Sequence, residues 1–279
     1  MKIKFKKMHG AGNDFVVMTD SSALPKDLST LAISMCDRHF GIGADGLMLA
    51  ASSKASDVKM VFYNADGSVA EMCGNGVRCF SKYVYEEGIV SKSEFDVETL
   101  AGIQHINLTE KDGEVVSVRV VMGKPRLNPK DVPVQTQKTE FVDQPAQIEG
   151  EEVLLTSMRV GVPHTMIFNE NFDSRTVTEL GPIVEKHDYF PEKTNVNFVE
   201  VISESELRLA TWERGAGATL ACGTGACASF YAAYAKGLVK DVVDVHVPGG
   251  CLKISLNAKD EIIMEGNAVL VAEGYYYYK

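Results

Sequence analysis

Short segments in which apolar and polar residues alternate, or apolar residues form brief runs, recur along this 279-residue chain. Many are rich in β-branched and aromatic residues, a composition typical of strands. The first half has predicted strands at residues 4–10, 15–20, 58–64, 94–100, 105–110 and 115–122, with a short apolar strand after Gly46. The second half has them at 153–161, 164–169, 196–202, 207–214, 243–248 and 252–257, followed by a last strand in the tail 268–279.

Helical periodicity is strong in one segment of each half and weaker in another. In the first strong segment, Val77, Phe80, Val84 and Tyr85 recur at helical spacing, which predicts a buried stripe. The predicted helices cover residues 75–87 and 224–236, and the weaker ones cover 26–38 and 174–187.

The two strong helical segments begin with the same motif. Cys-Gly-Xaa-Gly occurs at Cys73 and again at Cys222. A glycine follows the two cysteines at the same distance in both halves, and a polar residue, Asn64 or Glu213, precedes them at equal distances. Such long flanks around one motif indicate an internal duplication.

The duplication extends upstream and predicts two homologous domains. The spacing from Asn13 to Cys73 equals that from the start of Val162-Pro163-His164 to Cys222. A repeat of roughly 150 residues is too long for a solenoid unit. We expect an α/β (α+β) chain of two pseudo-symmetric domains. The expected domains are 1–122 with the strand 269–279, and 123–268, with the proline-rich segment 123–150 as the crossover.

Composition and charge restrict the class of protein. A hydrophobic fraction of 45% and a charged fraction of 24% are those of an ordinary globular chain. The net charge of −10 argues against a nucleic-acid partner. The basic start is not followed by an apolar stretch, and no apolar run reaches about 18 residues, so we expect neither export nor a membrane partner. Six sparse cysteines then predict reduced thiols in the cytoplasm.

Two cysteines in duplicated helix starts predict chemistry at an α-carbon. Inversion needs a base on one face of the carbon and an acid on the other, and Cys73 and Cys222 could serve as thiolate and thiol in turn. The N–H groups of Gly74-Asn75 and Gly223-Thr224 could bind a substrate carboxylate at the helix N-termini. The positive ends of the two helix dipoles would also lower the pKa of the thiols, and the two cysteines would titrate as a coupled unit.

At these residues the sequence resembles the diaminopimelate epimerase family. The resemblance implies two similar domains, each a mixed sheet wrapped around a central helix, in a homodimer without pyridoxal phosphate, metal or other cofactor. It implies interconversion of L,L- and meso-diaminopimelate, in lysine and peptidoglycan precursor synthesis. The matching stretches are KMHGAGNDFVV (7–17), GIGADGLM (41–48), NADGSVAEMCGNGVRCF (64–80), GVPH (161–164), LGPIVEKHDYFPEKTNVNFV (180–199), ERGAGATLACGTGACAS (213–229) and VPGG (247–250).

The resemblance also implies roles for particular residues. It places the catalytic pair at Cys73 and Cys222, and it assigns His164 and Glu213 to tuning the pKa of that pair. The implied substrate contacts are Asn13, Asn64, Asn195, Glu213 and Arg214, with the backbone at Gly74, Asn75, Gly223 and Thr224.

Two positions depart from the family pattern. Gly46 stands where some members have glutamine, and Val162 stands where many have asparagine. Both bear on the far end of an amino-acid substrate, so a related racemase of histidine, proline or lanthionine is the alternative. Arg214 is retained, and its planar guanidinium suits a distal carboxylate.

Other interpretations of the same residues remain open. Cys73, Cys79, Cys222 and Cys227 could form a zinc site, although intervening stretches of five and four residues suit one poorly. Residues 41–46 match the dinucleotide pattern G-x-G-x-x-G, but a helix-like segment precedes them and a strand follows, so we interpret them as a turn in which Asp45 is a cap. Cys36, Cys79, Cys227 and Cys251 are instead expected to be core residues. His164 could be structural, and the three asparagines could be turn residues.

Overall fold

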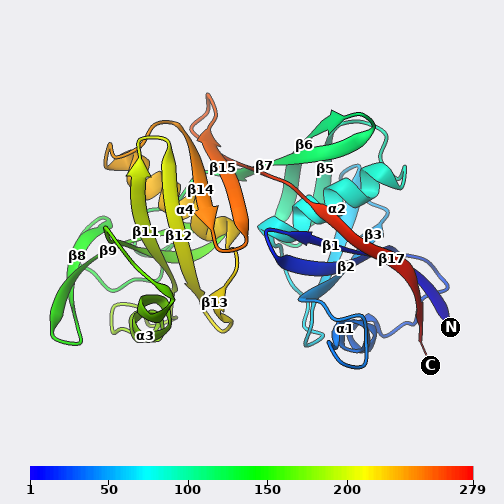
Figure 1. The fold of residues 1–279 in the computed structure, drawn as a ribbon, viewed down its shortest axis with the longest axis horizontal. Helices are drawn as coiled ribbons and strands as arrows, with labels where there is room; N and C mark the ends of the chain where they lie inside the picture. Colours follow the sequence, from blue (N-terminus) through cyan, green and yellow to red (C-terminus); the bar gives the residue numbers. More distant parts are fainter. Residues whose placement is uncertain (279) are drawn as a thin grey trace. The chain divides into compact units, whose positions relative to one another are not determined.

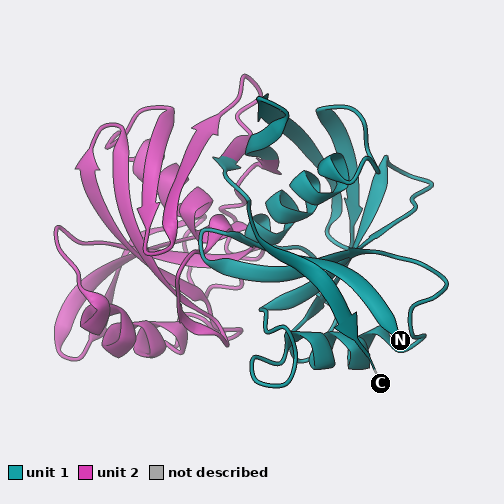
Figure 2. Cartoon of the chain, turned by 45° about the vertical axis from the view of Figure 1, so that its right-hand side comes forward, with its two compact units in different colours: residues 1–120, 265–279 teal, residues 121–264 magenta. Residues whose placement is uncertain are grey.

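The structure is a computed structural model that describes residues 1–278. The chain divides into two compact units, which Figure 2 shows in different colours. Unit 1 comprises Met1–Val120 and Glu265–Lys279, and unit 2 comprises Val121–Met264. Strands β7 (Glu114–Gly123) and β16 (Ile262–Gly266) carry the chain across the two boundaries.

Unit 1 is a mixed sheet with two helices (Figure 1). Its elements are α1 (Leu28–Cys36), α2 (Gly74–Glu86), β1 (Lys2–Gly10), β2 (Asn13–Thr19), β3 (Gly46–Ala51), β4 (Val58–Asn64), β5 (Glu94–Thr99), β6 (Gly102–Lys111), β7 and β17 (Val269–Tyr277). Neighbouring strands pair in the order β17-β1-β2-β3-β4-β5-β6-β7. The pairs β2–β3 and β4–β5 are parallel, and the others are antiparallel.

Unit 2 repeats this arrangement. Its elements are α3 (Ser174–Glu185), α4 (Gly223–Ala235), β8 (Phe141–Ile148), β9 (Glu151–Val160), β10 (Val162–Phe168), β11 (Asn195–Ser203), β12 (Glu206–Glu213), β13 (Gly217–Thr219), β14 (Val242–Val247), β15 (Gly250–Leu256) and β16. The strand order is β8-β9-β10-β11-β12-β14-β15, with β10–β11 and β12–β14 parallel and the other pairs antiparallel. The predicted α/β fold of two repeated domains is therefore confirmed.

Each unit buries one helix almost completely. In α2 every residue from Gly74 to Val84 is buried, and α4 contacts strands β9, β10, β11, β12, β14 and β15. The buried residues of α2 include the polar or charged Asn75, Arg78, Ser81 and Lys82, so a single apolar stripe underestimates the burial of this helix. Val77, Phe80 and Val84 are fully buried as predicted. The prediction is wrong for Tyr85, which is half-exposed in the last turn of α2, where its hydroxyl donates a 2.7 Å hydrogen bond to Glu110.

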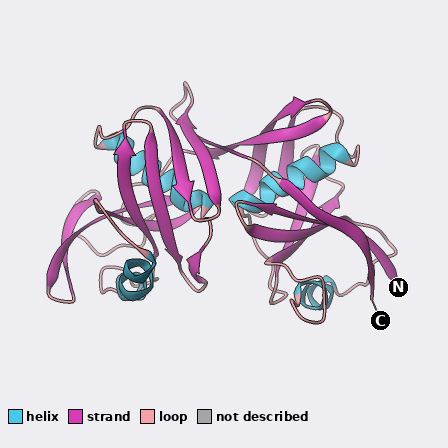
Figure 3. Cartoon of the chain, in the orientation of Figure 1, coloured by secondary structure: helices cyan, strands magenta, loops and turns pink. Residues whose placement is uncertain are grey.

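The second helix of each unit covers the other face of the sheet (Figure 3). Helix α1 packs Leu31 and Met35 against alternate residues of β2 and β3. Helix α3 packs Val177 and Val184 against alternate residues of β11. Because β2 is covered on both faces, all four residues from Phe15 to Met18 are buried. The predicted helices agree with α1 to α4 to within two residues at each end.

The segment 123–150 contains more structure than a crossover. Strand β8 lies within it and pairs with β9, and Pro145 sits in the middle of this strand. Proline is tolerated on edge strands, because it has no N–H to donate to a ladder. Strand β8 was therefore not predicted, because its sequence is polar and contains proline. The short strands β13 and β16 were also not predicted.

Among residues 1–278, none of the helices has the length and apolar character that crossing a membrane requires.

Glycine at position 41 is required by close packing on the end of α1. A Cβ there would overlap the carbonyl oxygen of Ser34 and would lie 2.8 Å from that of Met35. Both are backbone atoms, which cannot rotate away. We expect Gly41→Ala to lower the free energy of unfolding by about 1–3 kcal/mol, measured as a reduced thermal midpoint.

Gly274→Ala is the matched control, because a Cβ there would lie 3.6 Å from Phe5, an ordinary contact distance. This variant should unfold at or slightly above the wild-type temperature. Equal midpoints for the two variants would contradict the packing argument.

Candidate functional site

Cys73 and Cys222 occupy the same place in the two units. Each is the residue immediately before a buried helix, with extended backbone at φ −137°, ψ 126° for Cys73 and φ −115°, ψ 105° for Cys222. The first turn of a helix carries N–H groups that lack a partner within the helix. Each thiol therefore stands at the positive end of a helix dipole.

The sulfur of Cys73 faces an amide oxygen. Its Sγ lies 3.4 Å from Oδ1 of Asn13, and Nδ2 of Asn75 lies 3.4 Å from the same oxygen. The orientation of Asn13 is fixed from its other end, where Nδ2 donates a 2.6 Å hydrogen bond to Asp45. A carboxylate only accepts hydrogen bonds, so Oδ1 must be the atom turned toward Cys73.

A fully buried arginine supports the start of α2. Arg78 donates hydrogen bonds to Oδ1 of Asn75 at 3.0 Å, to the carbonyl of Gly74 at 3.1 Å and to the carbonyl of Asn267 at 3.3 Å. It thereby joins the helix start to the segment that precedes β17. Sequence reasoning missed Arg78, although a charged residue inside an otherwise buried helical segment was the available signal.

Asp45 belongs to an ionic cluster that anchors the turn before β3. Arg38 contacts Asp45 at 2.8 Å and Asp14 at 2.9 Å, and Lys7 contacts Asp14 at 3.0 Å. The two cations hold the pKa of Asp14 below its usual value against the opposing effect of burial. Residues 41–46 follow helix α1 and lead into a strand, which is the reverse of the order in a dinucleotide site.

Asn64 and Gly46 are neighbours at the end of β4. They pair directly across β3 and β4, and Asn64 bonds Ser68 through its side chain at 2.9 Å. A Cβ on Gly46 would lie 2.5 Å from the ring of Phe62. Phe62 therefore fills the space into which a longer side chain at position 46 would begin, which accounts for glycine there.

The sulfur of Cys222 faces a hydroxyl. Its Sγ lies 3.5 Å from Oγ1 of Thr224, and Nε2 of His164 lies 3.0 Å from the same hydroxyl. His164 is fully buried, and burial, with a smaller effect of the Arg214 charge, lowers its pKa to about 3. The imidazole is therefore neutral at physiological pH.

Cys222 itself is buried, and its surroundings favour the thiol. Burial raises its pKa well above the usual value, and the charge of Glu213 raises it further. Hydrogen bonds from Thr224 and from the backbone of Gly225 act in the opposite direction on this pKa. Glu213 accepts a 2.6 Å hydrogen bond from Thr219, which holds its carboxylate.

Asn195 and Arg214 are tied to each other and to nearby backbone. Asn195 accepts a 2.8 Å hydrogen bond from the backbone N–H of Arg214 and donates one of 2.8 Å to the carbonyl of Pro163. The guanidinium of Arg214 donates to the carbonyl of Glu192 at 2.8 Å. The Asn195 side chain therefore positions backbone, and Arg214 is exposed to solvent.

The remaining cysteines differ from this pair in their surroundings. Cys36, Cys79 and Cys227 are buried, and burial raises the pKa of Cys36 and Cys79 to about 12. Cys251 is exposed. Within residues 1–278 no group of three or more histidine, cysteine and acidic side chains is arranged to hold a metal ion.

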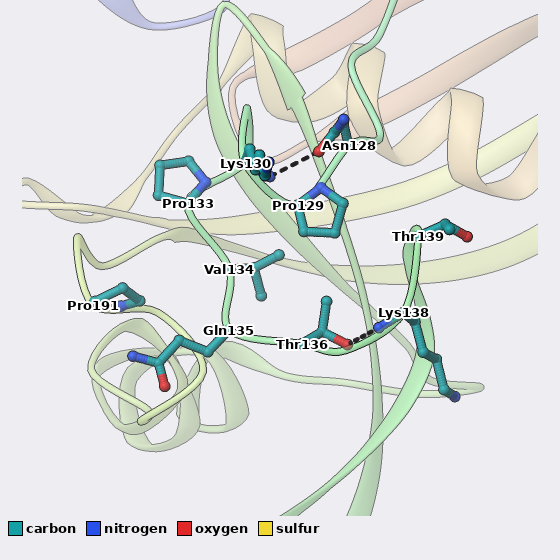
Figure 4. A pocket seen from close by; sticks show the side chains of 10 residues that line it. All are labelled: Asn128, Pro129, Lys130, Pro133, Val134, Gln135, Thr136, Lys138, Thr139 and Pro191. Atoms are coloured by element: carbon teal, nitrogen blue, oxygen red, sulfur yellow. Dashed lines mark hydrogen bonds between the residues drawn. The ribbon is translucent and has the colours of Figure 1, made fainter.

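A surface hollow of about 530 Å³ lies elsewhere in unit 2 (Figure 4). It contains none of the residues that the sequence analysis proposed for the site. Its lining is Asn128, Pro129, Lys130, Pro133, Val134, Gln135, Thr136, Lys138, Thr139 and Pro191.

Comparison with known proteins agrees with the sequence motifs. The family model for diaminopimelate epimerase matches residues 5–128 and 156–271. The chain is 46% identical over 277 residues to the diaminopimelate epimerase of Alkaliphilus metalliredigens, covering 99% of this chain and 98% of that protein. It is 47% identical over 272 residues to that of Caldanaerobacter subterraneus subsp. tengcongensis, covering 98% of both.

Solved structures share the fold at low sequence identity. A probable proline racemase from Agrobacterium radiobacter matches with a TM-score of 0.74 at 15% identity, covering 99% of this chain and 93% of that one. A hydroxyproline epimerase from Agrobacterium vitis matches with 0.72 at 16% identity, covering 98% and 92%. From the two matched family segments and the two close relatives that align over nearly its whole length, the chain belongs to the diaminopimelate epimerase family.

Proposed function

We propose that this isomerase interconverts L,L- and meso-diaminopimelate, a step of lysine and peptidoglycan precursor synthesis. The observation that carries the proposal is the pair of cysteines, each preceding the buried helix of its own unit, in a chain close to curated diaminopimelate epimerases. The substrate is thus a small free amino acid.

The proposed chemistry is proton exchange at one α-carbon. Cys73 removes the proton as thiolate while Cys222 delivers one as thiol, and the roles exchange in the reverse direction. Backbone N–H groups at Gly74-Asn75 and Gly223-Thr224 bind the α-carboxylate, because a helix N-terminus favours negative charge. They also stabilise the charge that develops when the α-proton leaves.

Further side chains contact the substrate in this proposal, namely Asn13, Asn64, Asn195, Glu213 and Arg214. Of these, Arg214 is assigned to the distal carboxylate, because its planar fork matches that group. Glu213 and His164 tune Cys222 in this proposal, which is supported by the effect of the Glu213 charge on the pKa of the thiol. The chemistry requires reduced thiols, which the cytoplasm maintains, so we assign the protein to that compartment.

We further propose a homodimer. Strand β17 exposes apolar and aromatic side chains, with Val271 54%, Tyr275 53% and Tyr277 72% exposed, and such surface is commonly covered by a partner. Sedimentation velocity measures the mass directly, and a monomer at micromolar concentration would contradict the assignment.

The catalytic assignment predicts the effect of removing either thiol. Cys73→Ala and Cys222→Ala should each lower kcat/KM for inversion by about 10²–10⁴-fold or more, because the proton donor or acceptor is lost. Cys251→Ser, which changes an exposed thiol, is the matched control and should retain activity. The measurement is incorporation of solvent deuterium at the α-carbon. Full activity in either alanine variant would exclude the two-cysteine mechanism.

The substrate assignment predicts selectivity across a panel. Diaminopimelate should be inverted fastest. Histidine and proline should be far slower, because neither presents a distal carboxylate to Arg214, and lanthionine should be intermediate, because its thioether bridge is longer. Stereochemical analysis of each amino acid after incubation in D₂O is the assay. If histidine, proline or lanthionine exchanged faster than diaminopimelate, that amino acid would be identified as the substrate in its place.

The environment of Cys222 predicts a pH effect. The negative charge of Glu213 raises the pKa of this thiol, so Glu213→Gln should lower it and increase the thiolate fraction at a given pH. The rate of Cys222 alkylation by iodoacetamide at pH 8, measured by peptide mass spectrometry, should therefore rise. The Cys251 peptide in the same digest is the internal control, and a slower rate at Cys222 would refute the assignment.

A further inference from the structure

The two units allow a position-by-position comparison through their strand registers. Phe15 pairs with Gly46 in unit 1, and His164 pairs with Asn195 in unit 2. In the adjacent strand pairs, Met48 lies opposite Phe62, and Asn197 lies opposite Thr211. The offset in residue number that relates Cys73 to Cys222 also relates each of these unit 1 positions to its unit 2 counterpart.

The equivalent side chains also lie against the same part of the central helix. A Cβ on Gly76 would lie 2.7 Å from the end of Met48, and a Cβ on Gly225 would overlap Oδ1 of Asn197. Both glycines belong to the first turn after the cysteine. Met48 and Asn197 are therefore structural counterparts beneath the two helix starts.

The chemistry at these counterparts differs between the units. Unit 1 has an apolar group of Phe15, Met48 and Phe62, with the two rings edge-on at 5.9 Å. Unit 2 has the buried polar group His164, Asn197 and Thr211 in the same places. Because unit 1 builds the same fold with apolar residues, folding alone does not require the polar group. Buried polar groups are costly unless fully hydrogen-bonded.

Hydrogen bonds in the polar group have a defined direction. Oδ1 of Asn197 accepts from Thr211 at 3.0 Å, and Nδ2 lies 3.4 Å from the carbonyl of Thr165, which can only accept. The amide nitrogen is therefore on the side of His164, whose Nδ1 lies 3.2 Å away. A neutral imidazole that accepts at Nδ1 carries its proton on Nε2.

The chain of hydrogen bonds extends from His164 to Cys222. With its proton on Nε2, His164 donates to the Thr224 hydroxyl at 3.0 Å, and the proton of that hydroxyl is turned toward other acceptors. The sulfur of Cys222 lies 3.5 Å away. Cys73 has a different neighbour, because Asn13 presents an acceptor oxygen to its sulfur.

We propose that Asn197 is a positioning residue that fixes the Nε2–H tautomer of His164 and thereby makes the Thr224 hydroxyl a hydrogen-bond donor to the sulfur of Cys222. This rests on the proposed catalytic role of Cys222. The donor stabilises the thiolate of a buried cysteine that faces the charge of Glu213 from β12 and the neutral His164 from β10. The cationic Arg214 follows Glu213 and acts on the His164 ring.

The first experiment measures the reactivity of Cys222 in the full chain. Thr224→Val removes the hydroxyl at nearly constant shape, and alkylation of Cys222 by iodoacetamide at pH 8 should slow by about 10- to 100-fold. Thr224→Ser keeps the hydroxyl and should keep the wild-type alkylation rate. Asn197→Met, which copies the unit 1 residue, should also slow it. Met48→Leu, at the counterpart position, is the control for packing, and unchanged alkylation in Thr224→Val would overturn the proposal.

The second experiment measures the tautomer of His164 in the wild-type chain. Long-range ¹H–¹⁵N correlation spectra of the wild-type chain show which ring nitrogen of His164 carries the proton, and His164→Gln identifies the signal. We expect a neutral ring with the proton on Nε2 between about pH 6 and 9. A proton on Nδ1, or an imidazolium at pH 7, would overturn the proposal. Full activity in Cys222→Ala would instead refute the proposed two-cysteine mechanism, and it would not alter the alkylation rates or the tautomer.

Discussion

The enclosure of one helix by a curled mixed sheet is the constraint on which each unit depends. Helices α2 and α4 can be buried only because small residues at their starts permit close contact with the sheet, as Gly76 does with Met48. The backbone N–H groups that lack a partner within the helix lie at the helix start. A cysteine immediately before that start meets the helix dipole and a shielded environment together.

Much of the fold could be predicted from periodicity, and the exceptions have physical causes. The four helices and most strands follow the apolar pattern, because burial on one or two faces leaves a regular trace in sequence. Strand β8 has no clear apolar pattern in the sequence, since an edge strand tolerates polar residues and Pro145. Tyr85 fits the helical spacing but lies where α2 approaches solvent, so spacing alone misplaced it.

The two cysteines of the candidate site are marked by a motif in the sequence, whereas some of the side chains that surround them are not. Cys73 and Cys222 share a duplicated motif, which is visible in one sequence. Asn197 and Arg78 act through contacts between segments far apart in the chain. Arg78 stands out only as a charge within a helical segment, and no pattern in the sequence marks Asn197. Asn195 illustrates the converse, because its side chain is engaged with backbone at Pro163 and Arg214.

Strand β17 has a consequence for the order in which the chain can fold during synthesis. Unit 2 is contiguous, whereas unit 1 needs the segment after Glu265, which pairs with β1 and supplies the Asn267 carbonyl to Arg78. Domains that emerge complete can fold first. Unit 2 can therefore fold before β17 has been synthesised, whereas unit 1, and with it the surroundings of Cys73, is completed only once β17 has emerged.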